Sequence, residues 1–292
     1  MVFLRLKWAI FGVLVALVGC TNSPQKTEVE LSPISPGTGF ILTTSLFYTT
    51  SSLATFRDNP NALTDNLLVE SGDAVLAPLT NLLGILNRGI ESNIHLIGEK
   101  GQAGKQIALP QCSPHDALSL PDNSIVISCY DSPFLEVLSS KGTLIRSIDL
   151  AAFADEDGIP ELDHMALVGN RLVVSAQLLD RADQFASTRN GILIILDSTT
   201  LDVVDTDANT PGLQGLELPC WDPYTRLYPN SSGEIVLACV SSFTQTEHAK
   251  IIKVDPVTGE TSVIADYDSL GGFPSDLVLD SEENPVVIVY TT

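Results

Sequence analysis

The stretch DALSLPDNSIVISCYDSPFLEVLSSKGTLIRSIDL, residues 116–150, decides the fold, because it reads as four short strands separated by turn residues. The strands are expected at 116–120, 125–130, 134–138 and 144–150. Turns are expected at Pro121-Asp-Asn-Ser124 and at Lys141-Gly142. No stretch after residue 20 sustains a long 3.6-residue apolar period, so the sequence predicts an almost entirely β domain.

The same four-strand phrase recurs along the chain. Copies of it begin near residues 73, 116, 164, 222 and 276. The copy at 164 is expected to end with a fourth strand at 201–205, and the next copy is expected to begin near Trp221. Four strands repeated every ~40–50 residues are typical of β-propeller blades, which stack around a central channel. A β-sandwich is the rival fold, but it does not require several copies of one phrase.

The strands expected at the two ends of the repeat region do not combine into one complete blade. Residues 40–47, 51–56 and 67–70 read as the second to fourth strands of a first blade. Residues 276–279 and 285–290 read as the first two strands of a last blade. We therefore expect six to seven four-stranded blades with an incomplete last one, because the chain is truncated at its C-terminus or because that blade is irregular.

Four longer phrases carry a family resemblance. They are Ser113-Pro-His-Asp116, Ile148-Asp-Leu-Ala-Ala-Phe-Ala-Asp-Glu-Asp-Gly-Ile-Pro-Glu161, Asp163-His-Met-Ala-Leu-Val-Gly-Asn-Arg-Leu172 and Lys253-Val-Asp-Pro-Val-Thr-Gly259. In this order they resemble the YncE-like family of secreted propeller proteins, which shares the YVTN-type repeat. The resemblance covers residues 39–292 and implies seven blades with no established catalytic motif.

The first twenty residues resemble a bacterial lipoprotein signal. Arg5 and Lys7 precede an apolar run at 8–18, which ends in Leu17-Val-Gly-Cys20. The sequence predicts a signal peptide at 1–19, cleavage before Cys20 and lipidation of the cysteine sulfur. A transmembrane helix needs about 20 apolar residues, more than this run offers. An ordinary cleaved signal is the other alternative.

Residues 20–38 are rich in Ser, Pro, Thr and Gly, and we expect them to form a disordered tether before a propeller domain at 39–292. Thr21 replaces the Asp that retains enteric lipoproteins in the inner membrane. The resemblance therefore implies anchoring to the outer membrane of a Gram-negative bacterium, on its periplasmic or surface face. The lipid would be the membrane contact, and we expect a monomer.

The chain is acidic, with 36 Asp and Glu residues against 15 Lys and Arg residues and a formal net charge of −21. Loss of Arg5 and Lys7 with the leader gives a mature net charge of about −23. Nucleic acid and anionic lipid are bound through Lys and Arg patches, so this balance argues against both as direct partners. The negative charge can instead serve solubility, affinity for cations or repulsion from like-charged surfaces.

Four cysteines remain besides Cys20. The expected hairpin near residues 122 and 123 places Cys129 opposite position 116, four residues beyond Cys112. The hairpin near 231 and 232 places Cys239 opposite position 224, again four residues beyond Cys220. This shared offset predicts the bridges Cys112–Cys129 and Cys220–Cys239 out of three possible pairings. An exported, oxidising compartment favours bridges, and no C-x-x-C spacing indicates a metal site.

A ligand-binding face is expected at the mouth of the channel. Acidic residues or a histidine recur where the first strand of each blade begins: Asp73, Asp116, Asp163 or His164, Asp222 and Asp276. The loops that follow second strands add Arg88, Tyr130, Asp131, Gln177 and Arg181. Capping of local backbone amides is the alternative role for the acidic residues. His115 and His164 adjoin carboxylates, but strand neighbours point to opposite faces, so we expect no acid–base pair there.

Two functions remain open. The first is non-enzymatic binding of a protein or small ligand at this face, because no catalytic constellation is present. The alternative is a calcium-dependent hydrolase or lactonase, whose ion would require Asp116, Asp163 and Asp222 to converge. A second calcium position is the acidic loop 154–158, with Asp155, Asp157 and the nearby Glu161 as oxygen donors; a solvated loop is its alternative.

Cys20→Ser should abolish lipidation, because serine lacks the thiol that takes the diacylglycerol. The variant should be released as a soluble protein or remain as an unprocessed precursor, whereas the wild-type protein should fractionate with membranes. Cell fractionation and mass spectrometry of the mature N-terminus measure both properties. An unmodified Cys20 at the wild-type N-terminus would contradict the lipoprotein prediction.

Overall fold

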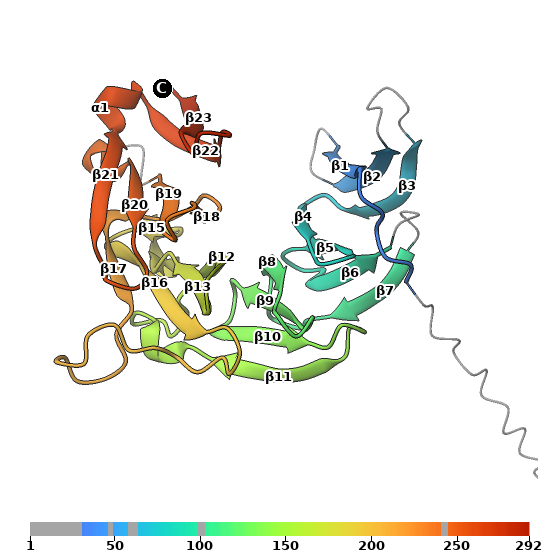
Figure 1. Cartoon of the computed structure of the whole chain (residues 1–292), viewed down its shortest axis with the longest axis horizontal. Coiled ribbons are helices and arrows are strands. Elements are labelled where there is room, and N and C mark those ends of the chain that lie inside the picture. Colours follow the sequence, from blue (N-terminus) through green and yellow to red (C-terminus); the bar gives the residue numbers. More distant parts are fainter. Residues whose placement is uncertain (1–30, 46–48, 58–63, 99–102, 241–244, 292) are drawn as a thin grey trace, which may run out of the picture. The chain divides into compact units, whose positions relative to one another are not determined.

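The computed structural model describes residues 31–45, 49–57, 64–98, 103–240 and 245–291, all within the unit Leu31–Thr292. They form a β-propeller of six antiparallel blades that follow one another along the chain (Figure 1). Blades 2 to 5 have four strands each, which confirms the predicted repeat. Blade 1 has three described strands and blade 6 has two.

The strand bounds are as follows. Blade 1 contains β1 (Thr38–Thr44), β2 (Thr50–Arg57) and β3 (Thr64–Ser71). Blade 2 contains β4 (Ala74–Pro78), β5 (Leu83–Asn87), β6 (Asn93–Ile97) and β7 (Ala103–Ala108). Blade 3 contains β8 (Pro114–Ser119), β9 (Ile125–Cys129), β10 (Phe134–Leu138) and β11 (Leu144–Asp149). Blade 4 contains β12 (Leu162–Val168), β13 (Arg171–Ala176), β16 (Asn190–Asp197) and β17 (Leu216–Trp221).

Blade 5 contains β18 (Tyr228–Pro229), β19 (Ile235–Cys239), β20 (Lys250–Val254) and β21 (Thr261–Asp266). Blade 6 contains β22 (Phe273–Leu279) and β23 (Pro285–Tyr290). A small hairpin, β14 (Leu179–Asp180) and β15 (Ala186–Ser187), is inserted between β13 and β16. The helical pieces are η1 (Ala151–Phe153), η2 (Arg181–Asp183), η3 (Thr246–His248) and α1 (Tyr267–Leu270).

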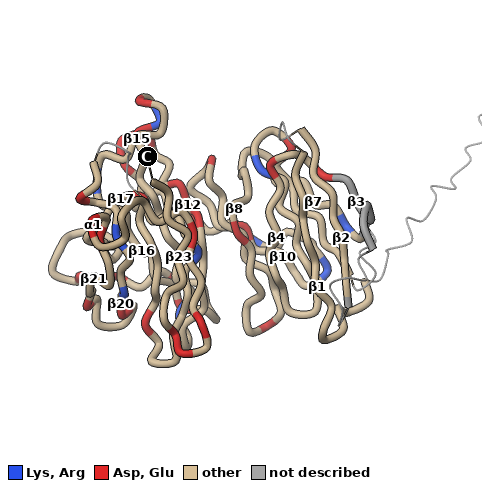
Figure 2. The backbone as a smooth tube through the Cα atoms, turned by 90° about the horizontal axis from the view of Figure 1, so that it is seen from above, with Lys and Arg blue, Asp and Glu red and all other residues tan. Residues whose placement is uncertain are grey.

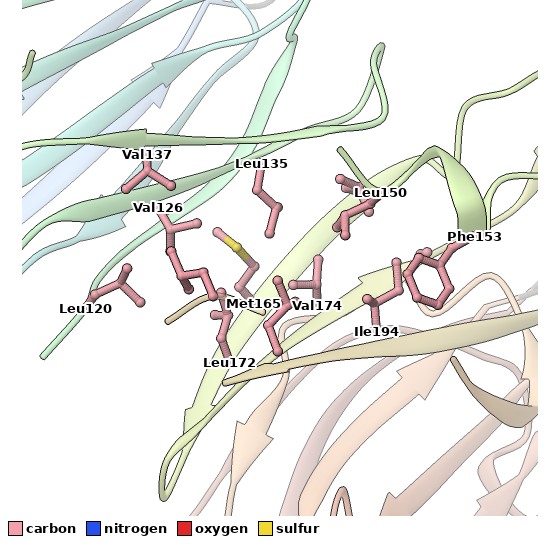
Figure 3. Packing of buried hydrophobic residues seen from close by; sticks show 14 residues of the cluster. Leu120, Val126, Leu135, Val137, Leu150, Phe153, Met165, Leu172, Val174 and Ile194 are labelled. Carbon is pink, nitrogen blue, oxygen red and sulfur yellow. The ribbon is translucent and has the colours of Figure 1, made fainter. Parts of the chain in front are cut away.

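Neighbouring blades are held together by apolar clusters that use both faces of the second strands. In β13, Leu172 and Val174 pack against blade 3, whereas Val173 between them packs against blade 5. In β19, Leu237 packs against blade 4 and Val236 packs toward blade 6. Figure 3 shows the cluster between blades 3 and 4, where side chains from both sheets point toward one another. Two-sided burial explains why these strands are apolar runs without alternation.

Two expectations about blades 4 and 5 are wrong. The fourth strand of blade 4 is β17, not 201–205, and only one isolated bridge, between Leu196 and Val203, marks the expected position. The chain first follows β16 there and then makes an excursion before it returns as β17. Blade 5 consequently begins at β18, so Asp222 lies in the connection before it rather than at the start of a strand.

Both predicted disulfides, Cys112–Cys129 and Cys220–Cys239, are confirmed. The first joins the segment before β8 to β9 within blade 3. The second joins β17 of blade 4 to β19 of blade 5, because Cys220 belongs to the earlier blade. It therefore links two blades, whereas the sequence placed it within one.

The N-terminal end of the described chain already contacts the propeller. Leu31 packs against the cluster between blades 2 and 3, and the Ile34 amide donates to the Asn81 carbonyl at 2.8 Å. This part of the expected tether is thus ordered on blade 2. The rest of the tether, Cys20 and the leader lie outside the described residues. Among the residues described, no helix has the length and apolarity needed to cross a membrane.

Blades 1 and 6 are separate sheets. Their strands pair as β1-β2-β3 and as β22-β23, and no ladder among the described residues joins the two sheets. The outward side chains of β22 and β23 include Val278, Val286 and Ile288, which are exposed. The last blade has the two strands that the sequence predicted, β22 and β23, in the described part of the chain.

Leu172→Ala should lower the free energy of unfolding by about 2–5 kcal/mol, because it leaves a cavity between blades 3 and 4. The matched control is Ile145→Ala on β11, where the side chain is 58% exposed and the change should cost at most about 0.5 kcal/mol. Urea denaturation measures both values. Equal losses in the two variants would contradict the interface assigned to Leu172.

Candidate functional site

The site lies on the first strands of blades 3 and 4, which run side by side. The ladder register shifts between Pro114 and Asp116 in β8, and between Leu162 and Met165 in β12. Shifts of this kind are β-bulges, which redirect side chains away from strict alternation. His115 lies within the first bulge, and Asp163 and His164 lie within the second.

These bulges bring the two His-Asp pairs together across the blade boundary. His115 Nδ1 lies 3.0 Å from Asp163 Oδ1. His164 Nδ1 lies 3.6 Å from Asp116 Oδ2, and its Nε2 lies 3.8 Å from Asp163 Oδ1. We call these four residues the His–Asp cluster. The expectation concerned His and Asp neighbours in sequence; the structure instead brings each histidine close to a carboxylate of the other blade, at the positions where the two strands bulge.

Both carboxylates of the cluster also hold protein groups in place. Asp116 Oδ1 accepts from the Ala117 amide at 2.9 Å, and Asp116 Oδ2 accepts from the Met165 amide of blade 4 at 2.9 Å. Asp163 Oδ2 accepts from Gln177 Nε2 at 2.8 Å. Asp116 therefore caps backbone amides of two blades, the alternative role that the sequence left open.

The neighbouring carboxylates favour the protonated form of His164. Burial lowers its pKa, but the charges of Asp163 and Asp116 outweigh this effect, so the pKa is raised from its usual value. The imidazolium form is thus favoured between two carboxylates. Its buried Nδ1 has no hydrogen-bond partner among the residues that the structure describes, since Asp116 Oδ2 is beyond hydrogen-bond range.

An aromatic and polar layer supports the cluster. The His115 ring stacks on Tyr130, with centroids 4.1 Å apart and planes 10° apart. Tyr130 Oη donates to Gln177 Oε1 at 2.9 Å, and Gln177 in turn holds Asp163. Burial raises the pKa of Tyr130, followed by the charge of Asp222 and then that of Asp163, so its hydroxyl stays protonated as a donor. Tyr130 and Gln177, both expected on the ligand-binding face, therefore orient the cluster.

Arg181 ties the loops of blades 3 and 4 together. Its guanidinium donates to Glu161 Oε1 at 2.5 Å, to Asp131 Oδ1 at 2.9 Å and to the Tyr130 carbonyl at 2.6 Å. The fully buried Glu161 also accepts from the Leu179 amide at 3.0 Å. Arg181 and Asp131 thus form a structural clamp beside the cluster.

The oxygens of the expected calcium positions are engaged in other contacts. Glu161 is held by Arg181, Asp155 Oδ1 accepts from the Asp157 amide at 3.2 Å, and Asp157 Oδ1 accepts from the Ile159 amide at 2.8 Å. Within the described ranges, no group of three or more His, Cys, Asp or Glu side chains is placed to hold a metal ion. These contacts give the loop a self-contained turn geometry.

The connection 222–227, between β17 and β18, brings further groups to the site. Asp222 has a left-handed backbone, with φ 48°, and its Oδ1 is buried with no hydrogen-bond partner among the described residues. Burial and the charge of Asp163 raise the pKa of Asp222 to about 7. Arg226 reaches from here to blade 2, where Nη2 donates to the Leu76 carbonyl at 2.9 Å.

Three expected members of the face have other roles. Asp73 and Arg88 form an ion pair with each other at the edge of blade 2, with Arg88 Nε 3.1 Å from Asp73 Oδ1. Asp276 is exposed, and its Oδ1 accepts from the Leu277 amide at 2.8 Å. Among the described contacts, no hydrogen bond or ion pair joins these three to the His–Asp cluster. Of the five positions predicted to form an acidic ring, Asp116 and Asp163 thus belong to the cluster, and Asp222 acts on it through its charge.

Sequence reasoning missed the hydroxyl groups that fix the bulges. Ser128 accepts from the Asp116 amide at 2.9 Å, and Ser175 accepts from the His164 amide at 3.0 Å. In blade 5, Thr225 accepts from the Ala238 amide at 2.8 Å. A signal was present, because Ser128 and Ser175 occupy the same place near the end of apolar second strands.

The charge of the surface agrees with that of the site. Asp and Glu positions are spread over the turns of the blades, with fewer Lys and Arg positions among them (Figure 2). Burial, followed by the charge of Asp163, raises the pKa of Tyr224; Asp222 and Asp276 act in the same direction, whereas Arg88 opposes them. The environment of this phenol is therefore predominantly acidic.

Comparison with known proteins supports the fold and gives no family. No family model and no curated protein matches the chain. Hydrazine synthase of Kuenenia stuttgartiensis is similar with a TM-score of 0.62 and 14% identity over 91% of this chain and 76% of that one. An inactive variant of virginiamycin B lyase from Staphylococcus aureus, solved with quinupristin, has a TM-score of 0.57 and 12% identity over 89% and 81%. A protein from Lactobacillus plantarum has a TM-score of 0.57 and 15% identity over 88% and 76%. At such identities the likeness establishes the propeller fold.

Asp222→Asn should make stability less dependent on pH. The folded-state pKa of Asp222 is raised, so its carboxyl ionises more readily in the unfolded chain, and it destabilises the fold as pH rises from about 4 to about 7. Relative to wild type, the variant should gain roughly 2–4 kcal/mol over this window. Urea denaturation at pH 4, 5.5 and 8 measures the difference, with Asp268→Asn on exposed α1 as the control. A constant difference across pH would refute the assignment.

Proposed function

We propose that the mature protein is a lipid-anchored, extracytoplasmic binding propeller, which holds a small ligand at the connection 222–227, beside the His–Asp cluster. The anchor rests on the leader and Cys20, which lie outside the described residues. The resemblance to YncE-like proteins, which implies no established catalytic motif, supports a binding role. The structure contributes the candidate site.

One observation carries the proposal: Asp222 Oδ1 is buried and has no hydrogen-bond partner within the described part of the chain, beside a network in which the Asp116 and Asp163 oxygens accept hydrogen bonds. An unsatisfied buried acceptor costs about 1–3 kcal/mol, so proteins rarely retain one without a role. The left-handed backbone at Asp222 is a second local cost. A ligand that donates a hydrogen bond to this oxygen would recover the first of them.

Acid–base catalysis is the second candidate, and the His115–Asp163 contact of 3.0 Å favours it. A carboxylate that orients an imidazole through Nδ1 leaves Nε2 to accept a proton from a substrate. One structural neighbour is a lyase, and this supports the possibility by analogy of fold only. The calcium-dependent version has less support, because an ion at Asp116 would displace the Met165 amide.

Thermal-shift and calorimetric screening of the full-length protein in detergent tests the binding role. The probes are a defined panel of alkylamines, alkyl carboxylates and neutral sugars. At least one class should raise the melting temperature of the wild-type protein and should lose this effect in Asp222→Asn. Equal binding by wild type and Asp222→Asn for every class would contradict the site.

His115→Ala separates the two candidate functions. A binding protein should keep most of its ligand affinity in this variant, since the acceptor that the ligand would use belongs to Asp222, whereas His115 stacks on Tyr130 and contacts Asp163. An enzyme should instead lose turnover of ester or lactone probes by at least about 100-fold. Turnover by wild type that disappears in His115→Ala would favour catalysis.

A further inference from the structure

The connection 222–227 combines the groups that recognise an organic cation. Asp222 offers a buried acceptor without a partner among the described residues. Tyr224, two residues further along, leaves 52% of its surface exposed. A carboxylate beside an aromatic ring is the usual protein environment for ammonium and guanidinium groups, because the ring face attracts positive charge.

The site already accommodates one organic cation from the protein itself. The Arg226 guanidinium donates to the Leu76 carbonyl at 2.9 Å and lies 3.9 Å from Asp116 Oδ1. Its side chain remains 41% exposed. A guanidinium has five N–H donors, and the Asp116 contact is longer than a hydrogen bond. Arg226 therefore contacts Asp116 as an ion pair without a hydrogen bond.

The surroundings discriminate against other ligand classes. An anion would face Asp163 and Asp222, and the cations nearby are already engaged: Arg181 by Glu161 and Asp131, Arg226 by the Leu76 carbonyl, and His164 between Asp116 and Asp163. A neutral ligand would satisfy Asp222 Oδ1 but would gain nothing from the surrounding charge. The strongly acidic chain also raises the local concentration of cations.

We propose that the site binds a small organic cation, an alkylammonium or guanidinium compound, which pairs with the Asp222 carboxylate and lies against the Tyr224 ring. This inference rests on the proposed binding function and names its ligand class. The cation supplies the donor that Asp222 Oδ1 does not find among the residues described. Its charge is balanced by the Asp222 carboxylate with which it pairs.

Isothermal titration of the full-length protein in detergent tests the inference, with agmatine and choline as cations and butyrate and glucose as controls. At about 150 mM salt, at least one cation should bind and both controls should not. Asp222→Asn should weaken that binding at least about tenfold. Tyr224→Leu should weaken it severalfold, whereas Tyr224→Phe, which keeps the ring, should not.

Asp268→Asn is the matched control, because it removes the same charge from exposed α1. Circular dichroism and melting curves establish that each variant is folded. Absence of cation binding to the wild-type protein would overturn the inference, as would equal weakening by Asp268→Asn and Asp222→Asn. If butyrate or glucose binds instead and Asp222→Asn abolishes that binding, the proposed function stands and the cation class is wrong.

Discussion

Burial of both faces of each second strand is the constraint on which the structure depends. Strands β9, β13 and β19 are buried along their whole length apart from the first residue of β13. A single sheet cannot cover both of its own faces, so each of these blades requires a neighbour on either side. The five apolar clusters, each located between two consecutive blades, meet that requirement. Stacking in this way also brings the first strands of successive blades side by side.

The polar site is a consequence of this stacking. Once β8 and β12 adjoin, their bulges direct histidines and carboxylates into the boundary between blades, where every polar group needs a partner. The hydroxyls of Ser128 and Ser175 satisfy the amides that the bulges release. Gln177 and Tyr130 then fix Asp163 and His115. The resulting network is ordered before any ligand arrives, which lowers the entropic cost of binding.

Sequence patterns predicted the features that are determined by residues close together along the chain. Turn residues and apolar runs located the strands of blades 2 and 3, and hairpin geometry predicted both disulfides. The prediction failed where the chain departs from the repeat, as in the excursion before β17. It also failed for contacts between blades: a period of two residues cannot describe a bulge, and no local pattern indicates that Arg226 reaches Leu76, 150 positions away.

The distribution of satisfied and unsatisfied groups underlies the proposal that the site recognises a hydrogen-bond donor. Calcium is held by several oxygens that converge on the ion. Here the Asp116 oxygens accept hydrogen bonds from backbone amides, Asp163 accepts from Gln177, and Glu161 accepts from Arg181. Among the described residues of the site, Asp222 Oδ1 is a buried acceptor without a hydrogen-bond partner, and Tyr224, two residues further along, is exposed. This oxygen can accept one N–H, and the negative charge around it favours a donor that carries positive charge.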